Sequence, residues 1–385
     1  MRILSCAIGW MGMGWALALS AGAQNNALSG EQARQLPAQG FEQFYSLEYD
    51  AATRIFERLR DADPGNPYAH HRVALAYLYK QLYRAGVLEG DLFGASNRFF
   101  RMKKIKVDPA LDRSFQQSSE TSIRLCEQRL KRDKKDEEAL YACGVAYATR
   151  ATYQGLVERS VFDSMGSASR ANDFHSRLVQ IDPRYYDAYL VPGLYEFALG
   201  SLPGPLKVLL FFTGLSGEKA RGIRLVESVA QWGNGARYDA QILLTVMYRR
   251  ERRFPDARRT LEALAAAFPR NFVFPLEIAS IHRAAGETEE AIRNYDRVLG
   301  QAQQGAPGYQ DAPVARIHYE LGDLYRKKGD LESARQHLQQ VAGSRGSTPD
   351  LERESALLQQ QIEQSLKQPE KTEPAVPSMG QVTRR

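Results

Sequence analysis

Histidines are the first candidates for chemistry in this 385-residue chain, because imidazole binds metals and transfers protons near neutral pH. The chain has six: His70, His71, His175, His282, His318 and His337. They show no metal-ligand spacing, and no HExxH motif is present. His175 and His282 fall on a helical pattern, so we expect them to be packed histidines. The sequence predicts neither a metal site nor a cofactor.

Motifs for nucleophilic catalysis or phosphate binding are also missing. There is no G-x-S-x-G motif, no paired carboxylates and no nucleophile beside a base. The run GLSGEK at 214–219 superficially resembles a phosphate loop but lacks the GxxxxGK[ST] spacing. We therefore predict that the protein is not an enzyme and has no catalytic residues.

The chemistry open to the cysteines depends on whether an N-terminal signal is removed. Residues 3–20 carry no charge and follow Arg2, and Ala21-Gly22-Ala23 suits cleavage of a secretory signal at 1–23. A retained membrane anchor is the alternative. Cleavage would remove Cys6 and leave Cys126 and Cys143 on two expected helices that touch. In an exported protein this pair either forms a disulfide or stays as two buried thiols.

The charge balance excludes a nucleic-acid footprint. The formal net charge is +6, the isoelectric point is about 9.1, and 25% of residues are charged with mixed sign. Basic clusters such as residues 249–253 fall at expected helix ends, where cations complement the helix dipole. A solvated face is the simple explanation, and an acidic partner or a membrane surface is the alternative.

Small residues at a fixed period indicate how the chain is built. Ala257 and Ala291 lie 34 residues apart, and each is followed by large apolar residues one and two turns later. A small residue is needed where paired helices cross, and one helix pair alone leaves an apolar face exposed. Ala334 repeats the pattern after an expected loop at 301–311, and a longer loop is expected at 155–166.

This pattern resembles that of tetratricopeptide repeat (TPR) proteins. The resemblance implies an all-α, TPR-like α-solenoid, a right-handed superhelix of antiparallel helix pairs with inserted helices, over residues 36–366. Residues 24–35 are expected to be a linker. A polar-backed helix at 349–366 should cap the solenoid through the stripe Leu351, Leu358, Ile362 and Leu366. Residues 367–385 are rich in Pro, Glu and Lys and are expected to be disordered.

A narrower resemblance covers residues 202–222, LPGPLKVLLFFTGLSGEKARG. This run is similar to one in the inclusion body clearance (tetratricopeptide repeat protein 39) family, which implies a helical-repeat fold without catalytic residues. Within it, the apolar insertion 203–215 includes ten residues that begin at Leu206 and end at Leu215. We expect this insertion either to be wedged inside the superhelix or to contact a membrane surface or partner.

The TPR resemblance also implies a binding face. TPR proteins commonly bind peptides with fixed positions of the first helix in each unit. On this sequence these positions include Ile242, Val246, Arg249, Leu276, Arg283, Arg316, Tyr319, Asp323 and Arg326. The expected groove is apolar midway with a basic lip. It either takes a peptide, or faces solvent, or is filled by the chain's own insertions.

The function expected from these features is that of a non-catalytic, exported scaffold. Its partner would be a protein or peptide, and its place the periplasm or cell envelope. Two alternatives remain at this point. One is a membrane-associated structural protein docked through residues 203–215, and the other is a periplasmic ligand-binding or transport-accessory subunit.

Overall fold

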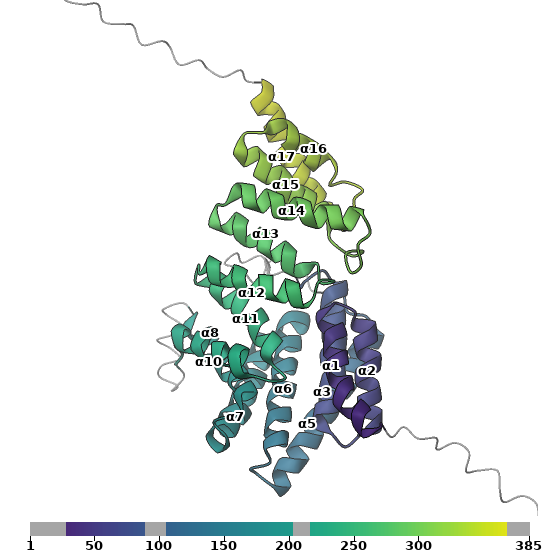
Figure 1. The fold of residues 1–385 in the computed structure, drawn as a ribbon, viewed down its shortest axis with the longest axis vertical. Coiled ribbons are helices and arrows are strands. Elements are labelled where there is room, and N and C mark those ends of the chain that lie inside the picture. Colours follow the sequence, from purple (N-terminus) through teal and green to yellow (C-terminus); the bar gives the residue numbers. More distant parts are fainter. Residues whose placement is uncertain (1–27, 89–104, 203–215, 368–385) are drawn as a thin grey trace, which may run out of the picture.

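The structure, a computed structural model, describes residues 28–88, 105–202 and 216–367 (Figure 1). The expected signal peptide at 1–23, the apolar insertion 203–215 and the tail from residue 368 onward lie outside these described residues. The described residues form helices and contain no strand. In chain order the α-helices are α1 (Gly30–Tyr45), α2 (Tyr49–Ala62), α3 (Pro67–Arg84), α5 (Pro109–Arg132), α6 (Glu137–Tyr153), α7 (Val161–Ile181), α8 (Leu190–Gly200), α10 (Lys219–Trp232), α11 (Arg237–Arg250), α12 (Phe254–Ala267), α13 (Val273–Ala285), α14 (Thr288–Gln303), α15 (Val314–Lys328), α16 (Leu331–Gln339) and α17 (Pro349–Lys367).

Consecutive helices pack as antiparallel pairs that stack into an α-solenoid, as predicted (Figure 1). The small residues lie where the helices of a pair cross, and Ala257, Ala291 and Ala334 have no exposed surface. At Gly144 on α6 the approach is closer still, because an added Cβ would lie 1.8 Å from the His175 ring on α7. Side-chain size at these positions therefore sets how closely paired helices pack.

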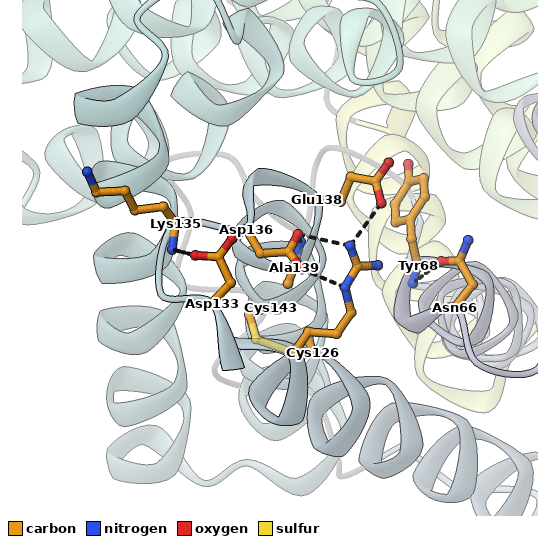
Figure 2. Close-up of polar contacts among 10 residues, drawn as sticks. Asn66, Tyr68, Cys126, Asp133, Lys135, Asp136, Glu138, Ala139 and Cys143 are labelled. Carbon is orange, nitrogen blue, oxygen red and sulfur yellow. Dashed lines mark hydrogen bonds and ion pairs between the residues drawn. A yellow bond between two sulfur atoms is a disulfide. The ribbon is translucent and has the colours of Figure 1, made fainter. Parts of the chain in front are cut away.

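At several helix starts, side chains satisfy free amides of the first turn. Asn66 and Asp108 cap α3 and α5, each with proline as the next residue. Asp136 accepts from the Ala139 amide at 3.0 Å and also pairs with Arg129 of α5 (Figure 2). The cap of α6 thus also ties α6 to the helix before it.

A disulfide joins the same two helices. Cys126 on α5 and Cys143 on α6 are bonded, with 5.5 Å between their Cα atoms (Figure 2). Both residues are fully buried. Of the two alternatives that the sequence left open, the structure has the bonded form.

Two segments expected to be irregular are helical. Helix α1 begins at Gly30, after a capping box between Ser29 and Gln32, so part of the expected linker at 24–35 belongs to the first helix pair. The loop expected at 155–166 is mostly helix, because α6 continues into a π-helical turn (Gln154–Glu158) and α7 starts at Val161. A left-handed residue, Arg159, makes the break between them.

The last helix covers the end of the stack. The Thr348 hydroxyl accepts from the Leu351 amide at 3.2 Å, and α17 packs on α15 and α16. Leu351 and Ile362 are buried as expected, but Leu366 is 55% exposed because it lies in the last turn, beyond the helices that α17 covers.

The first helix pair also packs against repeats far along the chain. Tyr45, at the end of α1, contacts the rings of Tyr238 and Phe268 at 5.5 and 5.1 Å. The Asn271 side chain donates to the Tyr45 carbonyl, and the Tyr83 hydroxyl donates to Asp311. The superhelix therefore closes on itself between α1–α3 and the α11–α14 segment (Figure 1).

No helix in the described part of the chain is both long and apolar enough to cross a bilayer.

Candidate functional site

The expected binding face lies on the first helices of the last three pairs, α11, α13 and α15. Ile242, Val246 and Arg249 come from α11, Leu276 and Arg283 from α13. Arg316, Tyr319, Asp323 and Arg326 come from α15. In the structure, the four arginines of this set each pair with an acidic side chain. The face is therefore less basic than expected.

The first contact joins α11 to α13. The Arg249 guanidinium lies 3.0 Å from Glu277 and donates to the Ser280 hydroxyl at 3.0 Å. Both charged side chains are almost buried, with 13% and 12% of their surfaces exposed. Arg249 was expected on a basic lip, and its charge is instead neutralised by the next repeat.

The second contact joins α13 to α15 in the same way. Arg283 lies 2.5 Å from Glu320, and Arg316 of α15 lies 2.8 Å from the other carboxylate oxygen. Only 3% of the Glu320 side chain is exposed. Burying a charged carboxylate is costly unless cations lie beside it, and Arg283 and Arg316 are the two cations beside Glu320.

These two contacts use equivalent positions of successive repeats. Arg249 and Arg283 each stand eight residues before the small residue of their second helix, Ala257 or Ala291. Glu277 and Glu320 each stand two residues before the small residue of a first helix, Ala279 or Gly322. An arginine-to-glutamate link is thus repeated from one first helix to the next. We call it the Arg–Glu ladder.

The ladder ends at α15. Arg326, the equivalent of Arg249 and Arg283, pairs within its own helix with Asp323 at 2.7 Å, and Lys327 pairs with the same carboxylate at 2.6 Å. Burial opposes ionisation of Asp323, but the hydrogen bonds from Lys327 and Arg326 outweigh it and lower its pKa.

The remaining predicted residues are apolar or aromatic. Ile242, Val246 and Tyr319 are half-buried and stay accessible between the paired charges. Leu276 differs from expectation, because it is 5% exposed and packs in the core formed with α14 and α15. The accessible part of the face is therefore apolar, with its charges largely paired internally.

Sequence reasoning missed the acidic half of the ladder. Glu277 and Glu320 lie one residue after the expected contact positions Leu276 and Tyr319, so the search for a binding face passed over them. The signal was present, because both repeats carry glutamate at the same place.

The first turn of α11 contacts α1. Asp239 in that turn accepts a hydrogen bond from the Tyr45 hydroxyl of α1 at 2.9 Å. This contact comes from the first helix pair and not from an inserted segment, so the filling of the groove by the chain's own insertions stays a prediction. Among the described residues, no group of three or more side chains is arranged to hold a metal ion.

Comparison with known sequences agrees with the repeat pattern. A family model described as tetratricopeptide repeat matches residues 274–343, which contain α14, α15, α16 and nearly all of α13. No curated protein matches the chain significantly. The local resemblance of residues 202–222 to the inclusion body clearance family is not tested by these comparisons and stays a prediction.

Comparison with solved structures finds other helical-repeat proteins. The APC/C hetero-tetramer Cut9–Hcn1 matches 87% of this chain with 13% identity and a TM-score of 0.47; the match spans about half, 51%, of that chain. PilW, a widely conserved type IV pilus biogenesis factor, matches 63% of this chain and 94% of its own, with 15% identity and a TM-score of 0.41. A tetratricopeptide repeat protein from Parabacteroides merdae matches 86% of this chain and 100% of its own, with 12% identity and a TM-score of 0.34.

Proposed function

We propose that this chain, a tetratricopeptide repeat protein, is a non-catalytic scaffold that is exported to the cell envelope and binds a protein or peptide partner along the first helices α11, α13 and α15. The observation that carries the proposal is the Arg–Glu ladder. It holds three successive first helices in register through Arg249–Glu277 and Arg283–Glu320. A partner would therefore meet a face that is already ordered, which lowers the entropic cost of binding.

The chemistry of this face favours a partner segment with apolar side chains. Ile242, Val246 and Tyr319 are the accessible groups between charges that are already paired. A strongly acidic peptide would have to compete with Glu277 and Glu320 for the same arginines. The partner we propose is an extended or helical segment that inserts apolar residues between these side chains.

Capture of a partner from the native host tests the proposal. The tagged full-length protein should recover a reproducible protein partner, and Val246→Glu should abolish recovery. Ala266→Glu is the matched control, because Ala266 is exposed on the second helix α12 and lies outside the proposed face. Loss of the partner in both variants, or in neither, would count against the face. Recovery of membrane fragments without a protein partner would favour the membrane-docked alternative.

Export has its own test. If residues 1–23 are a cleaved signal, N-terminal sequencing of the native protein should begin at Gln24. An intact Met1 in the soluble cell interior would overturn export, and an intact Met1 in a membrane fraction would favour a retained anchor.

A further inference from the structure

The first two turns of α7 are reversed in polarity relative to an ordinary surface helix. A helix on a protein surface usually buries its apolar side chains and exposes its polar ones. Here Val161, Phe162 and Met165 are 58%, 87% and 47% exposed, while Ser167 is buried. Large apolar side chains left in water contribute little to folding, and a group of them commonly marks an interaction surface.

The inward side of these turns is joined to the end of α6 by hydrogen bonds. The Ser164 hydroxyl donates to the Ala151 carbonyl at 2.8 Å, and the Ser167 hydroxyl donates to the Gln154 side-chain oxygen at 2.7 Å. Ala171, one turn further along α7, has no exposed surface. Small residues therefore hold α7 against α6, and the three exposed apolar side chains are not needed to position the helix.

A glycine lies on the exposed side of the same turns. Gly166 comes one turn after Phe162, and a Cβ added to it would meet no atom within 4 Å. Its φ is not in the left-handed region, so neither backbone conformation nor packing within the chain requires glycine here. Glycine inside a helix lowers stability relative to alanine, and its usual benefit is the close approach of another backbone. Ser169, one turn further on, is also small and exposed.

Charged side chains along this surface are arranged in a self-complementary order. Asp163 and Arg170 are exposed and seven residues apart, which is about two turns, so they lie on the same edge of the helix. Asp163 accepts from the Ser160 hydroxyl, and Arg170 donates to the Tyr147 hydroxyl at 2.8 Å. Among the described residues, neither forms an ion pair. If two copies of α7 lie antiparallel, Asp163 of each copy faces Arg170 of the other.

We propose that α7 is the contact surface of a two-fold symmetric homodimer. The α7 helices of the two copies lie antiparallel and cross near Gly166. Phe162 of each copy packs over Gly166 and Ser169 of the other. Two Asp163–Arg170 pairs lie along the edges of the contact. Dimers that use the same surface on both copies are the most common homo-oligomers.

The position of α7 suits this contact. Helix α7 lies at the outer edge of the molecule, where a second copy can reach it (Figure 1). A second copy also fits the charges better than an anionic lipid surface, which would repel Asp163. The contact lies outside the proposed α11–α15 face, so the dimer and the scaffold function can be tested separately.

Sedimentation velocity of the full-length protein tests the dimer. The wild type should pass from monomer to dimer between about 1 and 100 µM, because a contact between two helices is small. Gly166→Gln places a bulky side chain at the crossing and should weaken association at least tenfold. Gly300→Gln is the matched control, because Gly300 is also a helical glycine whose added Cβ would meet no atom within 4 Å. In dilute solution Gly166→Gln should melt no lower than the wild type, since glutamine favours helix more than glycine.

Charge reversal tests the antiparallel arrangement. Asp163→Arg and Arg170→Asp each place like charges opposite one another, so each variant alone should dimerise at least tenfold more weakly. An equimolar mixture of the two should form a heterodimer, because every pair then joins opposite charges. Recovery in the mixture also shows that both variants fold. Glu262→Arg, a charge reversal at an exposed position of α12, should dimerise like the wild type.

Three results would overturn the proposal. One is a wild type that stays monomeric up to about 100 µM. Another is a dimer that Gly166→Gln and both charge variants leave unchanged. The third is the absence of a heterodimer from folded charge variants. Flotation of a monomeric wild type with anionic vesicles, lost in Phe162→Asp, would assign the apolar side chains to a membrane surface instead.

Discussion

The side-chain amide of Asn271 donates to the backbone carbonyl of Tyr45 over 2.7 Å, although the two residues are 226 positions apart. Asn271 is 4% exposed, and its carbonyl oxygen also accepts from the Val273 amide at 2.9 Å. The Asn271 side chain therefore binds the first amide of α13 and also joins the first helix pair to the start of that helix.

Replacing Asn271 should weaken the contact between the first helix pair and the start of α13. Asn271→Ala leaves the Tyr45 carbonyl and the Val273 amide without their partner, and we expect a loss of about 1–3 kcal/mol in the free energy of unfolding. Urea unfolding measures it. Asn234→Ala is the control, because Asn234 is exposed in the loop before α11, and it should change stability by less than about 0.5 kcal/mol. Equal effects of the two variants would show that the closure contributes little.

The Arg–Glu ladder makes a second prediction. Arg283→Met removes one of the two cations that compensate buried Glu320, and we expect it to destabilise the protein by about 2 kcal/mol. Lys328→Met removes an exposed ion pair to Glu289 at 3.7 Å and should cost less than about 0.5 kcal/mol. The comparison uses the same urea measurement. A cost for Arg283→Met no larger than that of the control would mean that Arg316 alone compensates Glu320.

A pair of histidines between α15 and α16 predicts a dependence on pH. The His318 and His337 Nδ1 atoms lie 3.1 Å apart, and burial together with the charge of His337 lowers the pKa of His318 to about 4. Burial lowers the pKa of His337 as well, and the charge of Asp296 on α14 opposes this. In the unfolded chain His318 titrates near 6.5. As pH falls from 6.5 towards 4, His318 binds a proton in the unfolded state but not in the folded state. The free energy of unfolding therefore decreases across that pH range.

His318→Gln isolates this contribution. Between pH 6.5 and 4.5 the melting temperature of the wild type should fall more steeply than that of His318→Gln. Hydrogen exchange should locate the difference in α15 and α16. Buried His71 and His175 also have lowered pKa values, about 3 and 4, and they titrate in both proteins. Parallel melting curves for the two proteins would show that the His318 pair does not titrate on unfolding.

The cysteine pair gives a chemical prediction. The bond between Cys126 and Cys143 closes a loop with a sequence separation of 17, and such a loop stabilises by about 3 kcal/mol in the chain-entropy estimate. Peptide mapping without reduction should find the two cysteines in one cross-linked peptide, and reductant should lower the melting temperature. Cys143→Ala should melt like the reduced wild type. Two alkylated thiols at these positions in the native protein would contradict the bond.

The repeat architecture was predictable because it depends on side-chain size at short range. Ala257, Ala291 and Ala334 mark helix crossings in the sequence, and all three are fully buried there. The helix starts after Asn66 and Asp108 also depend on local chemistry, because an Asx residue before proline caps a helix, but the sequence prediction did not use this signal.

The features that sequence reasoning missed depend on contacts between distant or neighbouring repeats. Sequence reasoning placed Arg249 on a basic edge of the groove, because it did not place Glu277 of the next repeat beside it. The sequence around Asp239 does not indicate its hydrogen bond from Tyr45, because Tyr45 lies in a different helix pair 194 residues earlier. The loop expected at 155–166 was misjudged for a different reason. Its glycines and serines suggest irregular backbone, but the segment is helical except around Arg159.

The closure of the first helices onto α11–α13 also bears on how the chain folds. In an open repeat array each unit contacts only its neighbours, so folding can start anywhere and spread, and the ends can fray separately. Here the Tyr45–Asn271 contact ties together segments 226 residues apart, which raises the contact order of the native state. Because loop closure over this separation is entropically costly, we expect the contact to form late in folding. Once formed, it links the stability of the first helix pair directly to that of α13.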